Sequence, residues 1–276
     1  MLLCCLASVS CHTVKNDKWH PLLIEAGLVG WDTYLGPGYK NPQTKGELPL
    51  LGLNNDPNKV FSIINEDGKP TLRISGETFG GISTKQAFEN YHLRLEFKWG
   101  KLKWPPKEKD KRDSGLLYHA VGPHGADGGF WMRSQEFQLQ EGDCGDYWGV
   151  AGGIFDIQAR LNGDSTYIFD EKGQLLTFSA KSTVGRRCRK YPDAEKPSGE
   201  WNTIDLYCLG DTSVHMVNGV VTMILYHSRQ QEQERQIPLT KGKIQIQSEG
   251  AEVFYRHIQV RSIKKIPDII FKQSAS

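Results

Sequence analysis

The chain consists largely of short runs of hydrophobic or β-branched residues separated by turns rich in Gly, Asn, Asp and Pro. Such runs cover residues 71–75, 91–99 and 253–260, among others, and no long stretch with the 3.6-residue period of a helix lies between them. Strands at turn-bounded intervals without intervening helices are typical of antiparallel sandwiches and barrels. The pattern therefore predicts an all-β fold, and Asn218-Gly219 between two such runs predicts a two-residue hairpin turn.

The densest polar pattern lies between residues 112 and 153. Within it, Glu136, Gln138 and Gln140 alternate with Phe137 and Leu139. A strand with this alternation buries its apolar side chains on one face and brings a carboxylate and two amides together on the other. We expect that polar face to carry the chemistry of the protein.

Glu141 follows directly, and strict alternation would place it on the face opposite Glu136. A β-bulge would supply one extra residue at this point, and bulges are over-represented next to active sites. We therefore predict that Glu136, Gln138 and Glu141 share one face, with Glu136 and Glu141 as paired acid and base. An ordinary half-exposed strand is the alternative, but the run Gly-Asp-Cys-Gly-Asp-Tyr-Trp after Glu141 favours a site.

His119 ends an earlier strand-like run, residues 114–119, and is the third candidate catalytic residue. Together with Glu136 and Gln138 it could ligate one divalent metal ion, the one cofactor that we consider, whereas a hydrogen-bonded structural histidine is the alternative. Polar and aromatic side chains around the same face are candidates for substrate binding. These candidates are Arg112, Asp113, Tyr118, Trp131, Gln138, Asp143, Asp146 and Trp148. Core packing is the alternative for Trp131, and a salt-bridged rim pair is the alternative for Arg112 and Asp113.

Composition indicates an ordinary globular protein of 276 residues, of which 24% are charged and 38% hydrophobic. With 34 basic and 32 acidic residues the formal charge is +2, so we expect no nucleic-acid partner and favour a neutral one. The six cysteines include no CxxC spacing, which argues against a cysteine zinc site. Cys144 lies within the proposed site, although a small buried residue would explain it equally well.

The first ten residues are apolar and end in small residues before Cys11, as in a lipoprotein-type signal, although Ser8 stands where such signals usually have an apolar residue. We expect residues 1–18 to be this signal segment and a linker, with lipidation at Cys11. Residues 19–265 would form a single catalytic domain, and residues 266–276 a C-terminal tail. The expected location is periplasmic or on the outer membrane of a bacterium, with membrane contact through the lipid anchor alone, because no other apolar stretch approaches the ~20 residues of a membrane span.

Six motifs together resemble the 3-keto-disaccharide hydrolase domain family over about residues 31–263. They are Arg112-Asp-Ser-Gly115, Glu136-x-Gln138, Gly199-Glu-Trp-Asn202, His215-x-x-Asn218-Gly219, Gly242-x-Ile-x-x-Gln247 and Tyr255-Arg-His-Ile258. The resemblance implies a two-sheet jelly-roll sandwich of the concanavalin A-like lectin/glucanase type. It also implies 3-keto-glucoside 1,2-lyase and 3-keto-2-hydroxy-glucal hydratase activities on an oligosaccharide or glycoside. Many members have Asn-Ser-Gly where this chain has Asp113-Ser-Gly, which leaves the role of Asp113 open.

In such a reaction the C3 ketone acidifies the C2 proton, so that a base can remove it and the C1 aglycone can leave. Glu136, Glu141 and His119 are the candidates for base, acid and enolate or metal contact, in an order that the residues do not fix. Two alternatives remain open, a non-catalytic carbohydrate-binding module and a retaining glycoside hydrolase. Glucanases of the same fold carry E-x-D-x-x-E, and Gln138 in place of the middle Asp disfavours the second alternative.

Overall fold

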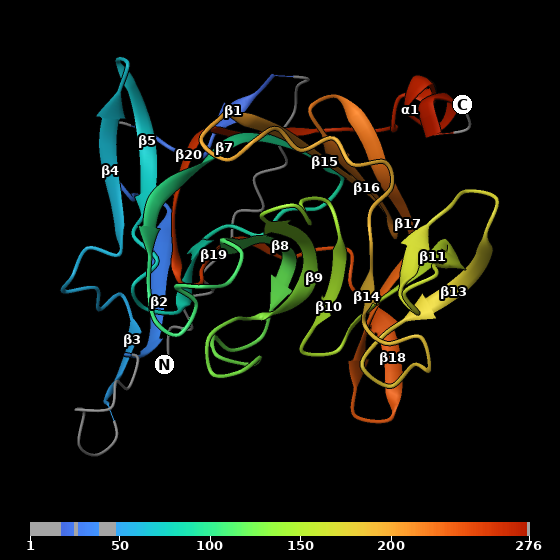
Figure 1. Ribbon diagram of the computed structural model, residues 1–276, viewed down its shortest axis with the longest axis horizontal. Coiled ribbons are helices and arrows are strands. Elements are labelled where there is room, and N and C mark those ends of the chain that lie inside the picture. Colours follow the sequence, from blue (N-terminus) through green and yellow to red (C-terminus); the bar gives the residue numbers. More distant parts are fainter. Residues whose placement is uncertain (1–17, 25–26, 39–47, 275–276) are drawn as a thin grey trace, which may run out of the picture.

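The computed structural model describes residues 18–24, 27–38 and 48–274, which form two antiparallel β-sheets packed face to face. The smaller sheet has eight strands among the described residues. In spatial order they are β14 (Arg187–Cys188), β10 (Tyr147–Val150), β9 (Arg133–Gln140), β8 (Asp113–Val121), β19 (Lys243–Ser248), β6 (Gly80–Thr84), β2 (Trp31–Pro37) and β3 (Leu50–Leu53). Figure 1 shows β8, β9 and β10 lying beneath an arch formed by strands of the larger sheet.

The larger sheet has twelve strands among the described residues. Its main path runs β12 (Tyr167–Phe169), β11 (Gly153–Leu161), β17 (Val220–Glu232), β16 (Thr212–Val217), β15 (Asn202–Leu209), β7 (Tyr91–Lys103), β20 (Ala251–Ser262), β5 (Lys69–Ile74) and β4 (Phe61–Glu66). Three further strands extend this path, namely β1 (His20–Pro21) beside β20, β13 (Gln174–Phe178) beside β11 and β18 (Arg235–Pro238) beside β17. The predicted two-sheet, all-β sandwich is therefore confirmed.

The hydrophobic core fills the space between the two sheets. Leu93, Leu95 and Phe97 alternate along β7 and are fully buried, as are Phe137 and Leu139 on β9. Each such side chain stabilises the fold by roughly 1.5–3 kcal/mol relative to an exposed one. The same alternation turns the residues between them outward, which is how β9 presents a polar face away from the core.

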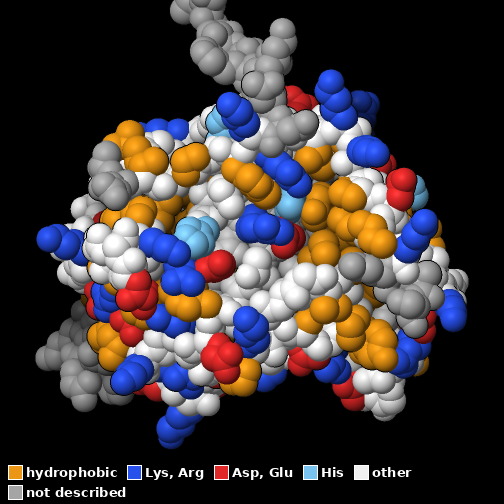
Figure 2. Space-filling model, turned by 90° about the horizontal axis from the view of Figure 1, so that it is seen from above, with side chains coloured by type: hydrophobic (Ala, Val, Ile, Leu, Met, Phe, Trp, Pro, Cys, Tyr) orange, Lys and Arg blue, Asp and Glu red, His pale blue; other side chains and the backbone are white. Residues whose placement is uncertain are grey.

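The outer face of the larger sheet carries charges of both signs. Figure 2 looks onto the side where β1, β7 and β20 lie in Figure 1, and it shows basic, acidic and hydrophobic side chains interspersed. On β7, Arg94 pairs with Asp205 at 2.7 Å and Lys98 pairs with Glu66 at 2.5 Å. This face therefore has no block of one charge sign along β7.

Two local predictions can be compared with the structure. Asn218 and Gly219 have φ values of 51° and 81°, as a type I′ hairpin turn requires, so the predicted turn between β16 and β17 is confirmed. The segment expected to be a tail instead ends in helix α1 (Asp268–Ser274), which contacts β17. Ile270 of this helix and Ile266 just before it are buried in the core. Burial of Ile266 and Ile270 explains this difference, whereas Ile269 and Phe271 remain exposed.

Cys144, Cys188 and Cys208 are buried free thiols. Cys11 and the rest of the predicted signal segment lie outside the described residues. Within the described part of the chain, α1 falls far short of the length and apolar character of a membrane span.

Candidate functional site

The site lies on the polar face of the smaller sheet, where β10, β9, β8 and β19 run side by side. Strand register brings its residues together. Glu136 on β9 is opposite Trp148 on β10, and Gln138 is opposite Gly115 on β8. The predicted alternation of β9 is therefore correct, and its polar residues face one pocket.

This pocket has a volume of about 210 Å³. Five of the residues that sequence analysis assigned to the site line this pocket, namely Asp113, Trp131, Glu136, Gln138 and Trp148. The remaining lining residues are Asp127, Gln140, Val150, Arg186, Gln247 and Glu249.

Glu136 is the most unusual group in the pocket. It is 6% exposed and has no hydrogen bond or ion pair within the described residues. Burial, followed by the negative charges of Glu249 and Asp113, raises the pKa of Glu136 well above its ordinary value, whereas Arg186 acts in the opposite direction. An unpaired buried carboxylate is costly, so the surroundings of Glu136 favour its protonated form.

Asp113, unlike Glu136, is held by three hydrogen-bond donors. It accepts hydrogen bonds from Lys107 Nζ at 2.6 Å, Gln138 Nε2 at 2.9 Å and Gln140 Nε2 at 2.7 Å. Burial raises the pKa of Asp113, and the Lys107 ammonium opposes that rise. With its oxygens occupied by these donors, Asp113 orients its neighbours and has little capacity left to exchange a proton with a ligand.

Glu249 shares the same ammonium, because Lys107 Nζ also lies 2.5 Å from Glu249 Oε1. Burial and the charge of Asp113 raise the pKa of Glu249 to about 8, against the effect of Lys107. Glu136 and Glu249 therefore form a pair of carboxyl groups with strongly raised pKa values in one pocket. Such pairs are a common arrangement for combined acid and base catalysis.

Gly115 forms the floor beneath these groups. A Cβ atom at this position would lie 2.3 Å from Glu136 Oε1 and 2.2 Å from Gln247 Oε1. Only a residue without a side chain lets the carboxyl and the amide approach the sheet this closely.

The amide of Gln247 is also available to a ligand. Its Oε1 atom is buried without a hydrogen-bond partner, and the residue is 2% exposed. Buried polar groups are nearly always satisfied, so an orphaned amide in a pocket points to a ligand or to water.

Two tryptophans and an arginine line the rest of the pocket. The indole Nε1 of Trp131 donates to the Gly80 carbonyl at 3.0 Å, which fixes the ring. Arg186 lies over the Trp148 ring, 5.4 Å from its centroid, and contacts Asp127 at 3.3 Å. These groups combine apolar surface for a sugar face with a positive charge.

The structure does not place Glu141 in the pocket. Strand β9 ends at Gln140 without a bulge there, and Glu141 begins a turn in which its backbone N–H donates to the Arg112 carbonyl at 2.9 Å. Its carboxylate pairs with the Arg112 side chain at 3.1 Å, which lowers the pKa of Glu141. We therefore correct the prediction of a Glu136–Glu141 pair, and Arg112 with Glu141 forms a rim ion pair outside the pocket lining.

His119 lies in the core between the sheets. A bulge occurs on β8 between Tyr118 and Val121, where His119 adopts φ = 52°, and its backbone packs against Gly242, which has no side chain to prevent this approach. The ring is fully buried against Tyr91 and Tyr118, and burial lowers the pKa of His119 to about 4. The bulge thus turns His119 away from Glu136, and the expected catalytic and metal roles of His119 do not fit this geometry.

Three of the predicted substrate contacts lie away from the pocket lining. Tyr118 is buried in the core, where its hydroxyl is 3.0 Å from His215 Nε2. Asp146 is buried and pairs with Arg187 at 2.6 Å, and Asp143 pairs with Lys111 at 2.7 Å. The ion pairs of Asp143 and Asp146 hold the turn after β9 and the adjacent strand β14, so these residues stabilise the strands of the site without lining the pocket.

Sequence analysis missed Glu249, Gln247, Arg186, Asp127 and Lys107. A signal for the first two was present, because Gln245, Gln247 and Glu249 alternate in the same manner as Glu136, Gln138 and Gln140. Since β19 pairs with β8, these two polar faces lie on one surface. Lys107 had no such signal, because it lies in a charged loop, residues 101–112, of the kind that is usually solvated.

The residues predicted to ligate a metal ion can be compared with the structure. Across the described ranges, no group of three or more His, Cys, Asp or Glu side chains has an arrangement that could hold a metal ion. His119 is turned away from Glu136 and Gln138, so the expected ligand set does not fit a metal ion.

Solved structures with similar folds include three for which the likeness extends over most of both chains. A candidate glycosyl hydrolase from Parabacteroides distasonis ATCC 8503 is 19% identical, with a TM-score of 0.49 over 90% of this chain and 100% of that chain. The carbohydrate binding module CBM66 from Bacillus subtilis is 7% identical, with a TM-score of 0.43 over 84% and 96% of the two chains. A protein of unknown function with a galectin-like fold, also from Bacillus subtilis, is 11% identical, with a TM-score of 0.44 over 89% and 95%.

A search of curated proteins gives no match. The sequence profile of one domain family, however, matches residues 18–261, which is nearly all of the described chain. The chain therefore belongs to the family of 3-keto-alpha-glucoside-1,2-lyase-like domains.

Proposed function

We propose that this protein cleaves 3-keto-glycosides by removal of the C2 proton and elimination of the C1 aglycone, followed by hydration. The observation that carries the proposal is Glu136, a buried carboxyl group without a partner on the floor of a pocket. A structural carboxyl group would be paired, because an unpaired one costs free energy. Family membership supplies the reaction class that this group would serve.

In the first step, ionised Glu249 takes the proton from C2 and the electron pair of the C–H bond moves toward the C3 ketone oxygen. The enolate then collapses to form the C1=C2 double bond while the C1–O bond breaks. Protonated Glu136 gives its proton to the departing aglycone oxygen. The products are the free aglycone and a 3-keto-2-hydroxy-glucal.

The assignment of base and acid follows from Lys107. Its ammonium lies 2.5 Å from Glu249 and so favours the ionised form of that group. Glu136 has no such contact, and the charges of Glu249 and Asp113 further favour its protonated form. The Lys107 contact thereby makes Glu249 the more readily ionised of the two carboxyl groups, as acid and base catalysis requires.

The developing enolate needs a hydrogen-bond donor or a positive charge. Arg186 lines the pocket and carries the positive charge. Preorganised donors of this kind typically contribute about 2.7–4 kcal/mol each to the transition state. The unpartnered atom of Gln247 is Oε1, an acceptor, so this side chain would bind a substrate hydroxyl group and not the enolate. Trp131 and Trp148 would hold the apolar faces of the sugar ring.

Hydration reverses the proton transfers. Water adds to C1 of the glucal and C2 is reprotonated, so that Glu136, now ionised, takes a proton from water and Glu249 returns its proton to C2. The sum of both steps is hydrolysis of the 3-keto-glycoside, and each group ends in its starting protonation state.

The experiment is to incubate the protein separately with a 3-keto-disaccharide and with the unoxidised parent disaccharide. Aglycone release from the keto sugar alone supports the proposal, whereas release from the parent at a similar rate would replace it with a conventional glycoside hydrolase. Saturable binding of either sugar without turnover would leave a carbohydrate-binding module, a function that the two tryptophans also suit. Glu136→Gln serves as the inactive control, because it keeps the shape of the side chain and removes the acid.

Export through a lipidated Cys11 is part of the same proposal. It is supported by the small residues before Cys11 and by the polar stretch after it. An exported enzyme would meet glycosides outside the cytoplasm, where this activity would act on them.

A further inference from the structure

A second hollow, of about 510 Å³, lies where β10 ends, and Ala151, Gly152 and Arg133 are among the residues that line it. It is lined by the turn between β10 and β11, by β13 and the loop that follows it, and by β17 and β18. Its volume falls within the range of about 300–1,000 Å³ that is usual for small-molecule sites. No step of the proposed reaction uses it.

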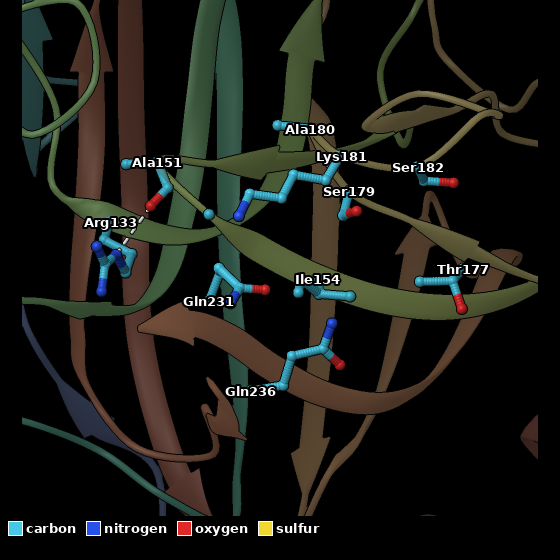
Figure 3. A pocket seen from close by; sticks show the side chains of 11 residues that line it. Arg133, Ala151, Ile154, Thr177, Ser179, Ala180, Lys181, Ser182, Gln231 and Gln236 are labelled. Atoms are coloured by element: carbon cyan, nitrogen blue, oxygen red, sulfur yellow. Dashed lines mark hydrogen bonds between the residues drawn. The ribbon is translucent and has the colours of Figure 1, made fainter. Parts of the chain in front are cut away.

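The charge of this hollow is one-sided. Arg133 and Lys181 line it, together with hydroxyl and amide side chains such as Ser179, Ser182 and Gln231, and no carboxylate is among the lining residues. Figure 3 shows the ammonium end of Lys181 extending over the hollow toward the side on which Arg133 and Gln231 lie.

Neither cation is paired with a carboxylate in the part of the chain that the structure describes. Arg133 donates to the Ala151 carbonyl at 2.8 Å and to Gln230 Oε1 at 3.3 Å, and both acceptors are uncharged. Within the described residues, neither Arg133 nor Lys181 takes part in an ion pair. Arg229 on the same strand as Gln230, by contrast, pairs with Asp156 at 2.8 Å. A half-buried guanidinium group without a counter-ion favours the binding of an anion, and its planar donors suit a carboxylate or a sulfate.

The hollow adjoins the catalytic pocket along the chain. Trp148 and Val150 line the catalytic pocket, and the next two residues, Ala151 and Gly152, line the hollow. The loop after β13 is likewise shared, because Ser182 lines the hollow and Arg186 lines the catalytic pocket. The two places are therefore neighbours along the chain, although they share no lining residue.

We infer that this hollow binds the anionic group of an acidic saccharide, either the carboxylate of a uronic acid or a sulfate ester. The hydroxyl and amide side chains would contact the sugar, and Arg133 with Lys181 would contact the oxyanion. The inference concerns binding alone and does not depend on the elimination reaction.

The test is isothermal titration of the whole protein with three disaccharides of glucose, one neutral, one with a glucuronate unit and one with a sulfate ester, and with inorganic sulfate. An anionic disaccharide should bind at least about 10-fold more tightly than the neutral one, given that a charge-assisted hydrogen bond contributes roughly 1.5 kcal/mol or more. Preference for glucuronate or for the sulfate ester then identifies the source of the oxyanion.

Three variants locate the binding. Lys181→Gln should weaken binding of the anionic disaccharide by about 5-fold, as expected for loss of one partly exposed ionic contact. Lys181→Arg should retain it, and Lys172→Gln, at an exposed lysine on the turn before β13, should leave it unchanged. Equal affinity for the neutral disaccharide, an unchanged affinity of Lys181→Gln, or equally tight binding of inorganic sulfate would each overturn the inference. A failure of catalysis with 3-keto sugars would leave these results unaffected.

Discussion

Substitution of Gly115 by alanine should disable the site while leaving the fold intact. The new Cβ atom would lie 2.3 Å from Glu136 Oε1 and 2.2 Å from Gln247 Oε1, whereas ordinary contacts begin near 3.4 Å. Both side-chain ends must therefore move by about 1 Å. A displacement of that size at reacting groups can cost about 100-fold in rate, because proton transfer depends steeply on geometry.

The cost to stability should be modest. Gly115 lies within β8 and does not have a positive φ, so alanine can adopt its backbone conformation. Overpacking of this kind costs about 1–3 kcal/mol, and replacing a glycine within a strand regains about 0.5–1 kcal/mol of that through the unfolded state. The net change should be a loss of no more than about 2 kcal/mol.

The assay compares Gly115→Ala with Gly81→Ala. Gly81 lies on β6, and its added Cβ would contact the Gln245 side chain at 2.9 Å without reaching Glu136. We expect kcat on a 3-keto-disaccharide to fall about 100-fold for Gly115→Ala and less than about 5-fold for Gly81→Ala, with similar changes in urea midpoint. If the two variants lose activity equally, or if Gly115→Ala keeps most of its activity, then the close approach of Glu136 to the sheet has no catalytic role.

The remaining predictions concern the carboxyl pair, the order of chemistry and the anchor. Glu136→Gln should lower kcat by at least about 100-fold with an unchanged thermal midpoint, and near-normal turnover would contradict the acid role. For Lys107→Met, the rising limb of kcat/KM against pH should move to higher pH. The reason is that Glu249 acts ionised, its pKa is about 8 with the ammonium in place, and loss of that ammonium raises the pKa further; an unmoved limb would exclude Glu249 as the base. Deuterium at C2 of the substrate should slow aglycone release or be lost to solvent, as mass spectrometry of the product would show, whereas full retention of the label without an isotope effect would exclude elimination. Cys11→Ser should move the protein from the membrane fraction to the soluble fraction, and a wild type that is already soluble would contradict lipidation.

The part of the site that sequence reasoning located depends on local alternation. Glu136 and Gln138 lie on one face of β9 because strand geometry alone fixes the relative direction of residues two apart. The same rule places Phe137 and Leu139 in the core. These assignments needed no knowledge of neighbouring strands.

The assignments that failed depended on irregularities. A bulge was expected near Gln140, but β9 ends there without one, which leaves Glu141 outside the pocket. A bulge occurs instead on the neighbouring strand at His119 and turns that side chain into the core. Alternation cannot locate a bulge, because the position of the bulge is set by packing such as the contact of Gly242 with the His119 backbone. Glu249 and Lys107 were hidden for a different reason, since they meet only through the pairing of β8 with β19 and the return of a loop.

The pocket at Glu136 and the hollow at Arg133 differ in charge. The pocket contains Glu136, Glu249 and Asp113, and the Lys107 ammonium contacts only Asp113 and Glu249, so these four groups carry a net negative charge when all three carboxyl groups are ionised. The pocket therefore disfavours an anionic ring and favours a neutral sugar, while the hollow with Arg133 and Lys181 has the opposite preference.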